Sequence, residues 1–245
     1  MKNTGYDQLA WFYNRYWGSQ YHSQLFRIFE SFVLSNLRPG SSVLDLCCGT
    51  GHLAKALAEK GYKITGIDSS GEMIRFAKAN VPEGTFLSFD ARHFELNGFD
   101  AVVSAFDSIN HITEVNDVEK VFGNVFTSLL SGGYFFFDLL LEEAYTQSWH
   151  KTGAYVEGDN ACFLRGGYDL EAGEAHTEVT MFRLIEGEWK RADCNVRQRC
   201  YDPQQILSAL TNSGFCDIEI RSARKDYGLE DDLGIGRVFF LARKP

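Results

Sequence analysis

The sequence lacks the long apolar runs that membrane and exported proteins carry. No stretch of its 245 residues approaches the roughly 18 consecutive apolar residues of a membrane-spanning helix, and the longest apolar run, 134–141, is interrupted by Asp138. The first residues hold Arg15 among polar side chains, without the apolar core of a signal peptide. We therefore expect a cytoplasmic protein with no membrane partner.

Positive charge and patterned cysteines are also scarce. Lys and Arg number 24 against 33 Asp and Glu, so the net charge is −9, and there is no run of Lys or Arg. Such a surface repels phosphate backbones, which argues against a nucleic-acid partner. The six cysteines have no CxxC spacing and the six histidines no HxxxH pair, so we expect reduced, buried thiols and no metal site.

What is present between residues 42 and 140 is a regular alternation of strand and helix patterns. Apolar runs predict strands at 42–46, 62–68, 85–90, 99–106 and 134–140. Apolar steps of three and four predict helices at 22–37, 52–60, 70–79 and 118–130. Ser69 followed by Glu72 predicts a capping box for the third of these helices. The alternation indicates a parallel sheet covered by helices on both faces.

The pattern changes after the fifth strand. Residues 154–201 have no helical signal, and their turn residues divide them into three predicted strands, 161–168, 175–185 and 188–201. A helix that Asp202 can cap follows, and the chain closes with strands predicted at 215–223 and 236–243. We expect an antiparallel meander inserted into the α/β domain, and an antiparallel hairpin at its end.

The strongest local motif is the segment Asp45-Leu46-Cys47-Cys48-Gly49-Thr50-Gly51 between a strand and a helix. Gly49 and Gly51 permit a tight turn and a close approach of the backbone to a ligand, and the following helix presents unpaired N–H groups. With Ala54 the turn also fits the dinucleotide pattern GxGxxG/A, which is weak evidence by itself. The alternative is a tight turn without a ligand.

Three further polar segments follow the next strands. Asp68 lies 17 residues after Gly51, where a carboxylate can accept both hydroxyls of a ribose. Asp90-Ala91 follows the third strand and Ala105-Phe106-Asp107-Ser108 the fourth. All lie at the carboxyl ends of parallel strands, where open α/β sheets bind ligands. The alternative for Asp68 is a helix cap, although Ser69 or Ser70 could fill that role.

Asp45 distinguishes two adenosine ligands. It lies four residues before Gly49, at the exit of the first strand. A carboxylate is unfavourable beside the pyrophosphate of NAD and favourable beside the ammonium of a methionyl group. The sequence therefore favours S-adenosylmethionine, unless Asp45 turns toward the N–H groups of its own loop.

These segments resemble the class I S-adenosylmethionine-dependent methyltransferases of the small-molecule type. The resemblance covers nearly the whole chain, through VLDLCCGTGHLA, GIDSSGEMI, SFDARHF, FDAVVSAFDSINHI, LLSGGYFFFDL and RCYDPQQILSALTNSGF. Cys47 and Cys48 stand where many members carry glycine or another small residue. The resemblance implies an α/β fold with a Rossmann-like, doubly wound, mostly parallel seven-stranded sheet, a C-terminal antiparallel hairpin and the inserted antiparallel β subdomain.

The resemblance also implies roles for individual residues. Residues matching Asp68, Asp90 and Ala91 bind ribose and adenine, and the residue matching Phe106 lies at the edge of the cofactor. The full expected set of cofactor contacts is Asp45, Cys47, Cys48, Gly49, Thr50, Gly51, Asp68, Ser69, Met73, Asp90, Ala91, Phe106, Asp107, Ser108 and Tyr13. The pattern Tyr6-Asp7-x-x-Ala10-x-x-Tyr13 resembles a segment that folds over the cofactor.

Three parts of the chain are expected from this resemblance. Residues 1–37 form a helical cover, 38–141 with 202–245 the cofactor-binding domain, and 142–201 an inserted β lid that governs the choice of substrate or makes the contacts of a homodimer. The N-terminal aromatic residues could line the mouth of a substrate site or pack as a helix on the sheet. They are Tyr6, Trp11, Phe12, Tyr13, Tyr16, Trp17 and Tyr21.

The expected reaction is methyl transfer to nitrogen, oxygen or a carboxylate of a small molecule, with donor and acceptor held in line in a dry pocket. A base is needed only for a protonated nucleophile, and the candidates are His111, Asp107 and Tyr13, with Asp138 beside them. His111 could instead be a surface or capping residue, and Asp138 a partner of loop N–H groups.

Two other functions compete with methyl transfer. An NAD-dependent oxidoreductase or epimerase would want a Tyr-x-x-x-Lys pair, but Tyr145 is followed four residues later by Trp149. A non-catalytic cofactor-binding protein is the second alternative.

Overall fold

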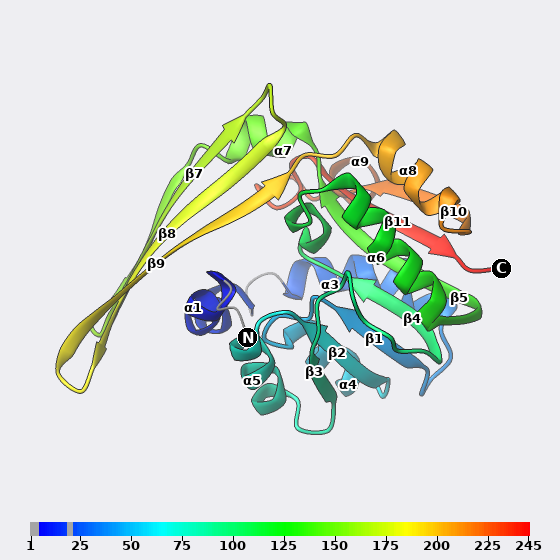
Figure 1. Cartoon of the computed structure of the whole chain (residues 1–245), viewed down its shortest axis with the longest axis horizontal. Helices are drawn as coiled ribbons and strands as arrows, with labels where there is room; N and C mark the ends of the chain where they lie inside the picture. The colour runs from blue at the N-terminus through cyan, green and yellow to red at the C-terminus, as the bar shows by residue number, and fades with distance from the viewer. Residues whose placement is uncertain (1–4, 19–21) are drawn as a thin grey trace.

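The computed structural model describes residues 5–18 and 22–245, and its centre is a seven-stranded sheet in the order β10-β11-β5-β4-β1-β2-β3 (Figure 1). The strands are β1 (Ser42–Leu46), β2 (Lys63–Asp68), β3 (Thr85–Ser88), β4 (Phe99–Ser104), β5 (Leu129–Leu140), β10 (Cys216–Ser222) and β11 (Arg237–Arg243). The first five run parallel, whereas β11 is antiparallel to both β5 and β10. The predicted fold class is confirmed.

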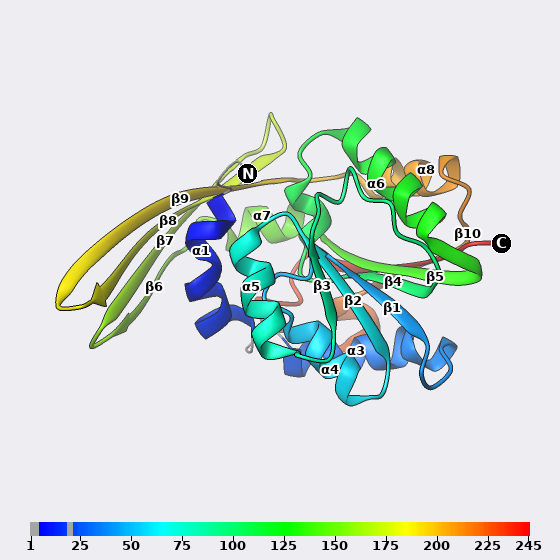
Figure 2. The ribbon, with the colours of Figure 1, turned by 60° about the horizontal axis from the view of Figure 1, so that its bottom comes forward.

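Helices cover both faces of this sheet, as Figure 2 shows. One face carries α3 (His22–Phe32), α4 (His52–Glu59), α5 (Gly71–Asn80) and α9 (Ala223–Tyr227), and the other carries α6 (Val115–Ser128) and α8 (Pro203–Asn212). The expected helix 22–37 ends at Phe32 and a short 3-10 turn, Leu34–Asn36, replaces its last part.

Strand β5 explains why a parallel strand reads as one continuous apolar run. Phe135 and Phe137 pack in the apolar cluster beneath α6, whereas Phe136 between them packs in the opposite cluster with Phe29 of α3. Both faces of the strand are buried, so no polar alternation is left in the sequence. The polar exception, Asp138, is buried too.

The cap of α5 differs from the expected one. Ser70, not Ser69, is the N-cap residue, and its hydroxyl accepts a hydrogen bond from the N–H of Met73 at 3.1 Å. The backbone is held in this register because Asp68 Oδ1 accepts the N–H of Ser70 at 2.9 Å. The predicted capping box at Ser69 is therefore wrong by one residue.

The segment after β5 begins with a helix, α7 (Glu142–Ser148), and continues as a second, antiparallel sheet. Its strands, in spatial order, are β6 (Thr152–Glu157), β7 (Asn160–Asp169), β8 (Glu174–Ile185) and β9 (Glu188–Arg199). The sequence predicted three of these strands and missed β6 and α7. Figure 1 shows the strands as a long twisted ribbon that extends beyond the central sheet.

The N-terminal helix α1 (Gly5–Phe12) lies between this second sheet and α5. Its Leu9 and Phe12 are buried against Cys162, Val179 and Met181 of the second sheet. On its other side, Asp7 accepts a 2.6 Å hydrogen bond from the hydroxyl of Ser70, next to the glycine-rich turn.

A π-helical turn, η1 (Tyr13–Trp17), follows α1. Within the described part of the chain, no helix is long and apolar enough to cross a membrane. Of the N-terminal aromatic residues, Tyr21 lies outside the described residues.

Candidate active site

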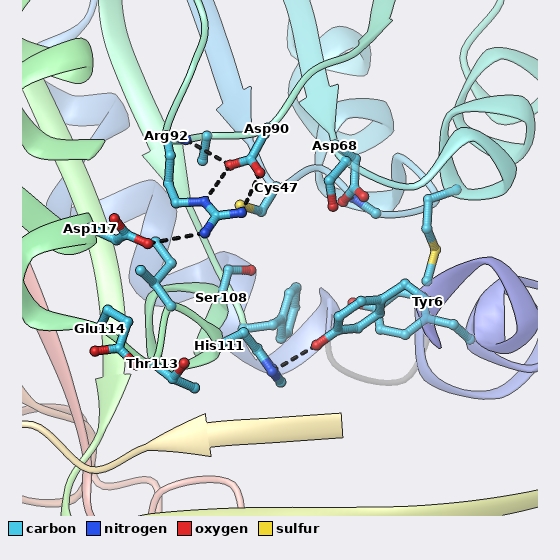
Figure 3. Close-up of a pocket in the computed structure, with 17 residues that line it drawn as sticks. Tyr6, Cys47, Asp68, Asp90, Arg92, Ser108, His111, Thr113, Glu114 and Asp117 are labelled. Atoms are coloured by element: carbon cyan, nitrogen blue, oxygen red, sulfur yellow. Dashed lines mark hydrogen bonds and ion pairs between the residues drawn. The ribbon is translucent and has the colours of Figure 1, made fainter. Parts of the chain in front are cut away.

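A cavity of about 270 Å³ opens where β1, β2, β3 and β4 end. Figure 3 shows the side chains around it, which come from the turn after β1, from α1 and from the segments that follow β3 and β4. Its lining includes Asp68, Asp90, Glu114 and Asp117, whereas Arg92 is the one Lys or Arg among the described residues that line it. We call it the first cavity, and its walls are predominantly acidic.

The turn after β1 is shaped by two left-handed glycines. Gly49 has a φ of +52° and Gly51 a φ of +79°. A Cβ on Gly49 would lie 3.4 Å from the ring of Tyr13, and one on Gly51 would lie 3.0 Å from Ala77. The positive φ favours glycine at both positions, and at position 51 the close contact with Ala77 also leaves little room for a side chain.

Asp68, at the end of β2, faces this turn. Its Oδ2 accepts the N–H of Gly49 at 3.0 Å and its Oδ1 accepts the N–H of Ser70. Burial raises the pKa of Asp68 to about 6. Each carboxylate oxygen retains a second acceptor site, so Asp68 can bind ligand hydroxyls without releasing the turn.

Asp45 is buried behind the same turn. Its Oδ2 has no hydrogen-bond partner among the residues that the structure describes. Burial, followed by the nearby Asp68, raises the pKa of Asp45 to about 8. Asp45 accepts a hydrogen bond from the backbone of Ala54, but a buried carboxyl oxygen without a partner is costly, and a cationic ligand beside it would offset that cost. This orphaned oxygen fits a ligand with an ammonium group and conflicts with a pyrophosphate.

Asp90 is engaged by a residue that the sequence did not suggest. Arg92 donates to both oxygens of Asp90, at 2.9 and 2.6 Å, and to Asp117 at 3.0 Å. Figure 3 shows its guanidinium between the two carboxylates at the cavity wall. The hydrogen bonds from Arg92 hold the pKa of Asp90 below its usual range.

A second cavity of about 370 Å³ adjoins the first. The two cavities share four lining residues, Tyr6, Tyr13, Phe106 and His111. The further walls of the second cavity are mostly apolar or aromatic and come from the inserted sheet, α1 and α7. They include Leu9, Trp149, Tyr155, Leu164, Val179 and Val196.

One wall of the second cavity carries a buried group of charges. Arg237, 5% exposed, donates to Asp107 at 3.0 Å and forms a short ion pair with Asp138. Two carboxylates thus surround one guanidinium, which leaves an excess of negative charge. Asp138 also accepts the N–H of Asp107 at 3.1 Å.

The backbone at this wall is strained. Phe106 and Asp107 have φ values of +64° and +50°, which non-glycine residues rarely adopt. Such conformations cost on the order of 1–3 kcal/mol each and persist where surrounding contacts enforce them. Here Asp138 and Arg237 supply these contacts, and the strain turns both side chains toward the cavities.

His111, at the end of the short helix η3 (Ser108–His111), joins several elements. Its Nδ1 lies 2.7 Å from the hydroxyl of Tyr6 and 3.0 Å from the carbonyl oxygen of Arg197, and its Nε2 lies 2.9 Å from Nε2 of Gln198. Burial lowers the pKa of His111. His111 is therefore a neutral imidazole at the boundary of the two cavities.

The predicted site residues separate into groups. Those that line the first cavity are Tyr13, Cys47, Gly49, Asp68, Ser69, Met73, Asp90, Ala91, Phe106, Ser108 and His111. Asp45, Cys48 and Thr50 line a small adjoining cavity, with Cys47, Tyr13 and Phe106. Gly51 packs against Ala77 instead, and Asp107 lines the second cavity.

Sequence reasoning missed Arg92, Gln198 and Arg237. Arg237 had a weak signal, because it begins a strand whose next five residues are apolar, although Arg243 at the exposed end of the same strand carries the same charge. Gln198 had none, since it lies among the polar residues of β9.

Comparison with known proteins agrees with this geometry. A family model described as "Methyltransferase domain" matches residues 43–133. A "Putative methyltransferase" of Geobacillus sp. (strain WCH70) is 30% identical over 227 residues, which cover 88% of this chain and 91% of the relative. Another relative, from Streptomyces fradiae, is named dTDP-3-amino-3,6-dideoxy-alpha-D-glucopyranose N,N-dimethyltransferase. It is 25% identical over 172 residues, which cover 69% of this chain and 66% of the relative.

A solved structure has the same fold. An S-adenosylmethionine-dependent methyltransferase from Clostridium acetobutylicum superposes with a TM-score of 0.79 at 22% identity, over 98% of each chain. Because the Geobacillus relative matches along most of both chains, and the glycine-rich turn and strand order agree with its family, the chain belongs to the class I S-adenosylmethionine-dependent methyltransferases.

Proposed function

We propose that this protein transfers a methyl group from S-adenosylmethionine to the nitrogen of a small-molecule amine. The observation that carries the proposal is the junction of the two cavities. A donor in the first cavity and an acceptor in the second would meet at the shared wall of Tyr6, Tyr13, Phe106 and His111.

The residues around the first cavity suit S-adenosylmethionine. Asp68 would hold the ribose hydroxyls, Asp90 and Ala91 would contact the adenine, and Asp45 would balance the ammonium charge. When bound, the cofactor supplies a methyl group already activated by a sulfonium. The protein's own contribution is to position the acceptor and to exclude water. The acidic lining argues against NAD, since a pyrophosphate would meet these carboxylates.

The second cavity favours an amine over a carboxylate. Asp107 and Asp138 outnumber Arg237, and all three guanidinium nitrogens already donate a hydrogen bond, to Asp107, to Asp138 and to the carbonyl of Leu233. An acidic acceptor would be repelled there, whereas an amine can donate an N–H to Asp107. The aromatic walls suit a positive charge that develops on the methylated nitrogen. The Streptomyces fradiae relative, named for dimethylation of an amino sugar, agrees with this chemistry.

We also propose that the three parts of the chain expected from the sequence have separate roles. Residues 1–37 act as a cover, 142–201 as a substrate lid, and 38–141 with 202–245 as the cofactor-binding domain. Tyr6 and Tyr13 from the cover and Tyr155 and Leu164 from the lid contribute to the second cavity. A cavity of about 370 Å³ suits a small molecule rather than nucleic acid or a large protein.

Two measurements test the function. Isothermal titration with S-adenosylmethionine, S-adenosylhomocysteine and NAD should show binding of the first two alone. Incubation with methyl-labelled cofactor and separate pools of amines, carboxylic acids, RNA and protein should label the amine pool. Binding of NAD would overturn the cofactor, and label in carboxylic acids or macromolecules would overturn the acceptor.

A further inference from the structure

Gln198, near the end of β9, connects the inserted sheet to the boundary of the two cavities. The side chain is buried, and its Nε2 lies 2.6 Å from Oδ2 of Asp107 and 2.9 Å from Nε2 of His111. A primary amide has two N–H groups, so both contacts can be hydrogen bonds at once. The inserted sheet thus reaches Asp107 and His111 through one side chain.

The surroundings determine how the amide is oriented. The reverse orientation would place its oxygen 2.6 Å from a carboxylate oxygen of Asp107, and two acceptors at that distance repel each other. The amide nitrogen must therefore face Asp107. It must then also face His111, so the imidazole Nε2 can only accept.

This orientation assigns the hydrogen on the imidazole. With Nε2 accepting from Gln198, the single hydrogen of neutral His111 is on Nδ1, where it faces the carbonyl oxygen of Arg197 at 3.0 Å and the hydroxyl oxygen of Tyr6 at 2.7 Å. Tyr6 then accepts with its oxygen, and its own hydroxyl hydrogen is directed elsewhere. Since Tyr6 lines both cavities, that hydrogen is available to a bound ligand.

We propose that Gln198 is a positioning residue that fixes His111 as the neutral Nδ1–H tautomer and thereby keeps the Tyr6 hydroxyl as a hydrogen-bond donor between the two cavities. In this state neither nitrogen of His111 is free to take a proton from the acceptor. His111 orients Tyr6 and is not the general base. Only the effect on catalysis rests on the proposed function, because the tautomer belongs to the free protein.

The groups that face His111 indicate that Gln198 keeps a proton away from its Nε2. Tyr6 faces it from α1, Asp107 from the residue before η3, and the carbonyl of Arg197 from β9. Oδ2 of Asp107 lies 3.9 Å from Nε2 of His111. Without the amide between them, the carboxylate would attract a proton to Nε2, as the Nε2–H tautomer or as the imidazolium.

The test is ¹⁵N NMR of the ligand-free full chain with labelled histidine, in which His111→Asn identifies the signals of His111. At neutral pH we expect an N–H nitrogen at Nδ1 and a bare, hydrogen-bonded nitrogen at Nε2. In Gln198→Met, which keeps the shape of the side chain, we expect the hydrogen to shift to Nε2. In Gln198→Glu, a second carboxylate should give the doubly protonated ring at neutral pH.

Asn195→Ala is the matched control, because Asn195 is an exposed residue of the same strand and points to the opposite face. It should leave the tautomer and the methylation rate unchanged. Gln198→Met should lower kcat by about tenfold to a hundredfold, as expected for a misplaced group, with an unchanged Kd for S-adenosylmethionine.

An Nε2–H signal in the wild type overturns the proposal, and so does a tautomer that neither Gln198 variant changes. The predicted tautomer in a protein that methylates no amine would leave the assignment of Gln198 intact and overturn the proposed function instead.

Discussion

The two cavities are built in different ways. The first takes most of its lining from short segments at the ends of four neighbouring strands, 47–49, 68–73, 90–92 and 106–117. The second takes its polar groups from positions far apart in the chain, such as Tyr6, Gln198 and Arg237. Its walls include the N-terminal helix, the inserted sheet and the last strand.

The difference has consequences for specificity. Segments that follow neighbouring strands shape most of the first cavity, so local sequence defines most of it. In the second cavity, a substitution on any of several elements can change the shape or the charge without affecting the turn after β1. The binding of the donor and the choice of acceptor should therefore be separable by mutation.

The largest effect is expected for Arg237→Met. The variant leaves Asp107 and Asp138 buried without their cation, which should lower the free energy of unfolding by about 3–5 kcal/mol. Below its melting temperature it should lose methyl transfer and retain its affinity for S-adenosylmethionine. Chemical denaturation, activity assays and titration calorimetry measure these three quantities.

Arg243→Met is the control on the same strand. Its side chain is 46% exposed and pairs with exposed Asp217 at 3.5 Å, so the loss should stay below about 1 kcal/mol. Equal losses of cofactor affinity and activity in Arg237→Met would show that the two cavities are not separable.

A smaller effect is expected for Asp68→Ala, and it should fall on the binding of the cofactor instead of on the acceptor. Loss of a charged acceptor for the ribose hydroxyls should weaken S-adenosylmethionine binding about tenfold to a hundredfold, because hydrogen bonds to charged groups contribute roughly 1.5–3 kcal/mol. The KM of the acceptor at saturating cofactor should not change. Titration calorimetry with Asp217→Ala as the surface control measures the change, and unaltered affinity would remove Asp68 from the cofactor site.

Asp45, in the small cavity that adjoins the first, predicts a dependence of stability on pH. Its folded-state pKa of about 8 lies above its usual value, so the folded protein retains a proton that the unfolded chain releases. The free energy of unfolding should therefore fall as pH rises from about 4 toward 8, by at most about 1.4 kcal/mol per pH unit. Asp45→Asn should remove the part of this slope that comes from Asp45, whereas Asp68 and Asp138, whose pKa values are each raised to about 6, keep theirs.

Thermal unfolding of both proteins between about pH 5 and pH 8 measures the difference. As pH rises, the melting temperature of Asp45→Asn should increase relative to that of the wild type. Parallel curves would mean that Asp45 is ionised in the free protein.

The smallest effect is expected for Leu164→Ala in the wall of the second cavity. Removal of partly buried methyl groups, each worth about 0.8 kcal/mol, should raise the KM of the acceptor about threefold to tenfold without changing cofactor affinity. Phe163→Ala is the matched control, since Phe163 is adjacent on β7 and 42% exposed on the opposite face. A change in cofactor affinity in Leu164→Ala would contradict the separation of the two cavities.

Much of the fold could be predicted because strong periodicity is a local property. The stepped helix α6 and the apolar strand β5 were predicted from their residues, except that Leu129 and Leu130, assigned to the helix, begin the strand. The alternation of strands and helices indicated the parallel sheet. The elements that the sequence did not predict are those whose apolar periodicity is weak. Strand β6 alternates between exposed and half-buried residues, and α7 is only seven residues long. Ser69 and Ser70 are both serines and either can cap a helix, and the hydrogen bond that Asp68 accepts from the N–H of Ser70 fixes which one does.

The sequence by itself determined the first cavity, because a glycine turn and carboxylates at strand ends have the same geometry wherever a parallel sheet places them. Only the tertiary structure decided the second cavity. The patterns at Tyr6, Gln198 and Arg237 indicate which face of an element a residue occupies, but not which distant residue it meets. Those partners depend on how the inserted sheet and the N-terminal helix pack against the central sheet, and through Gln198 that packing also places the hydrogen on His111.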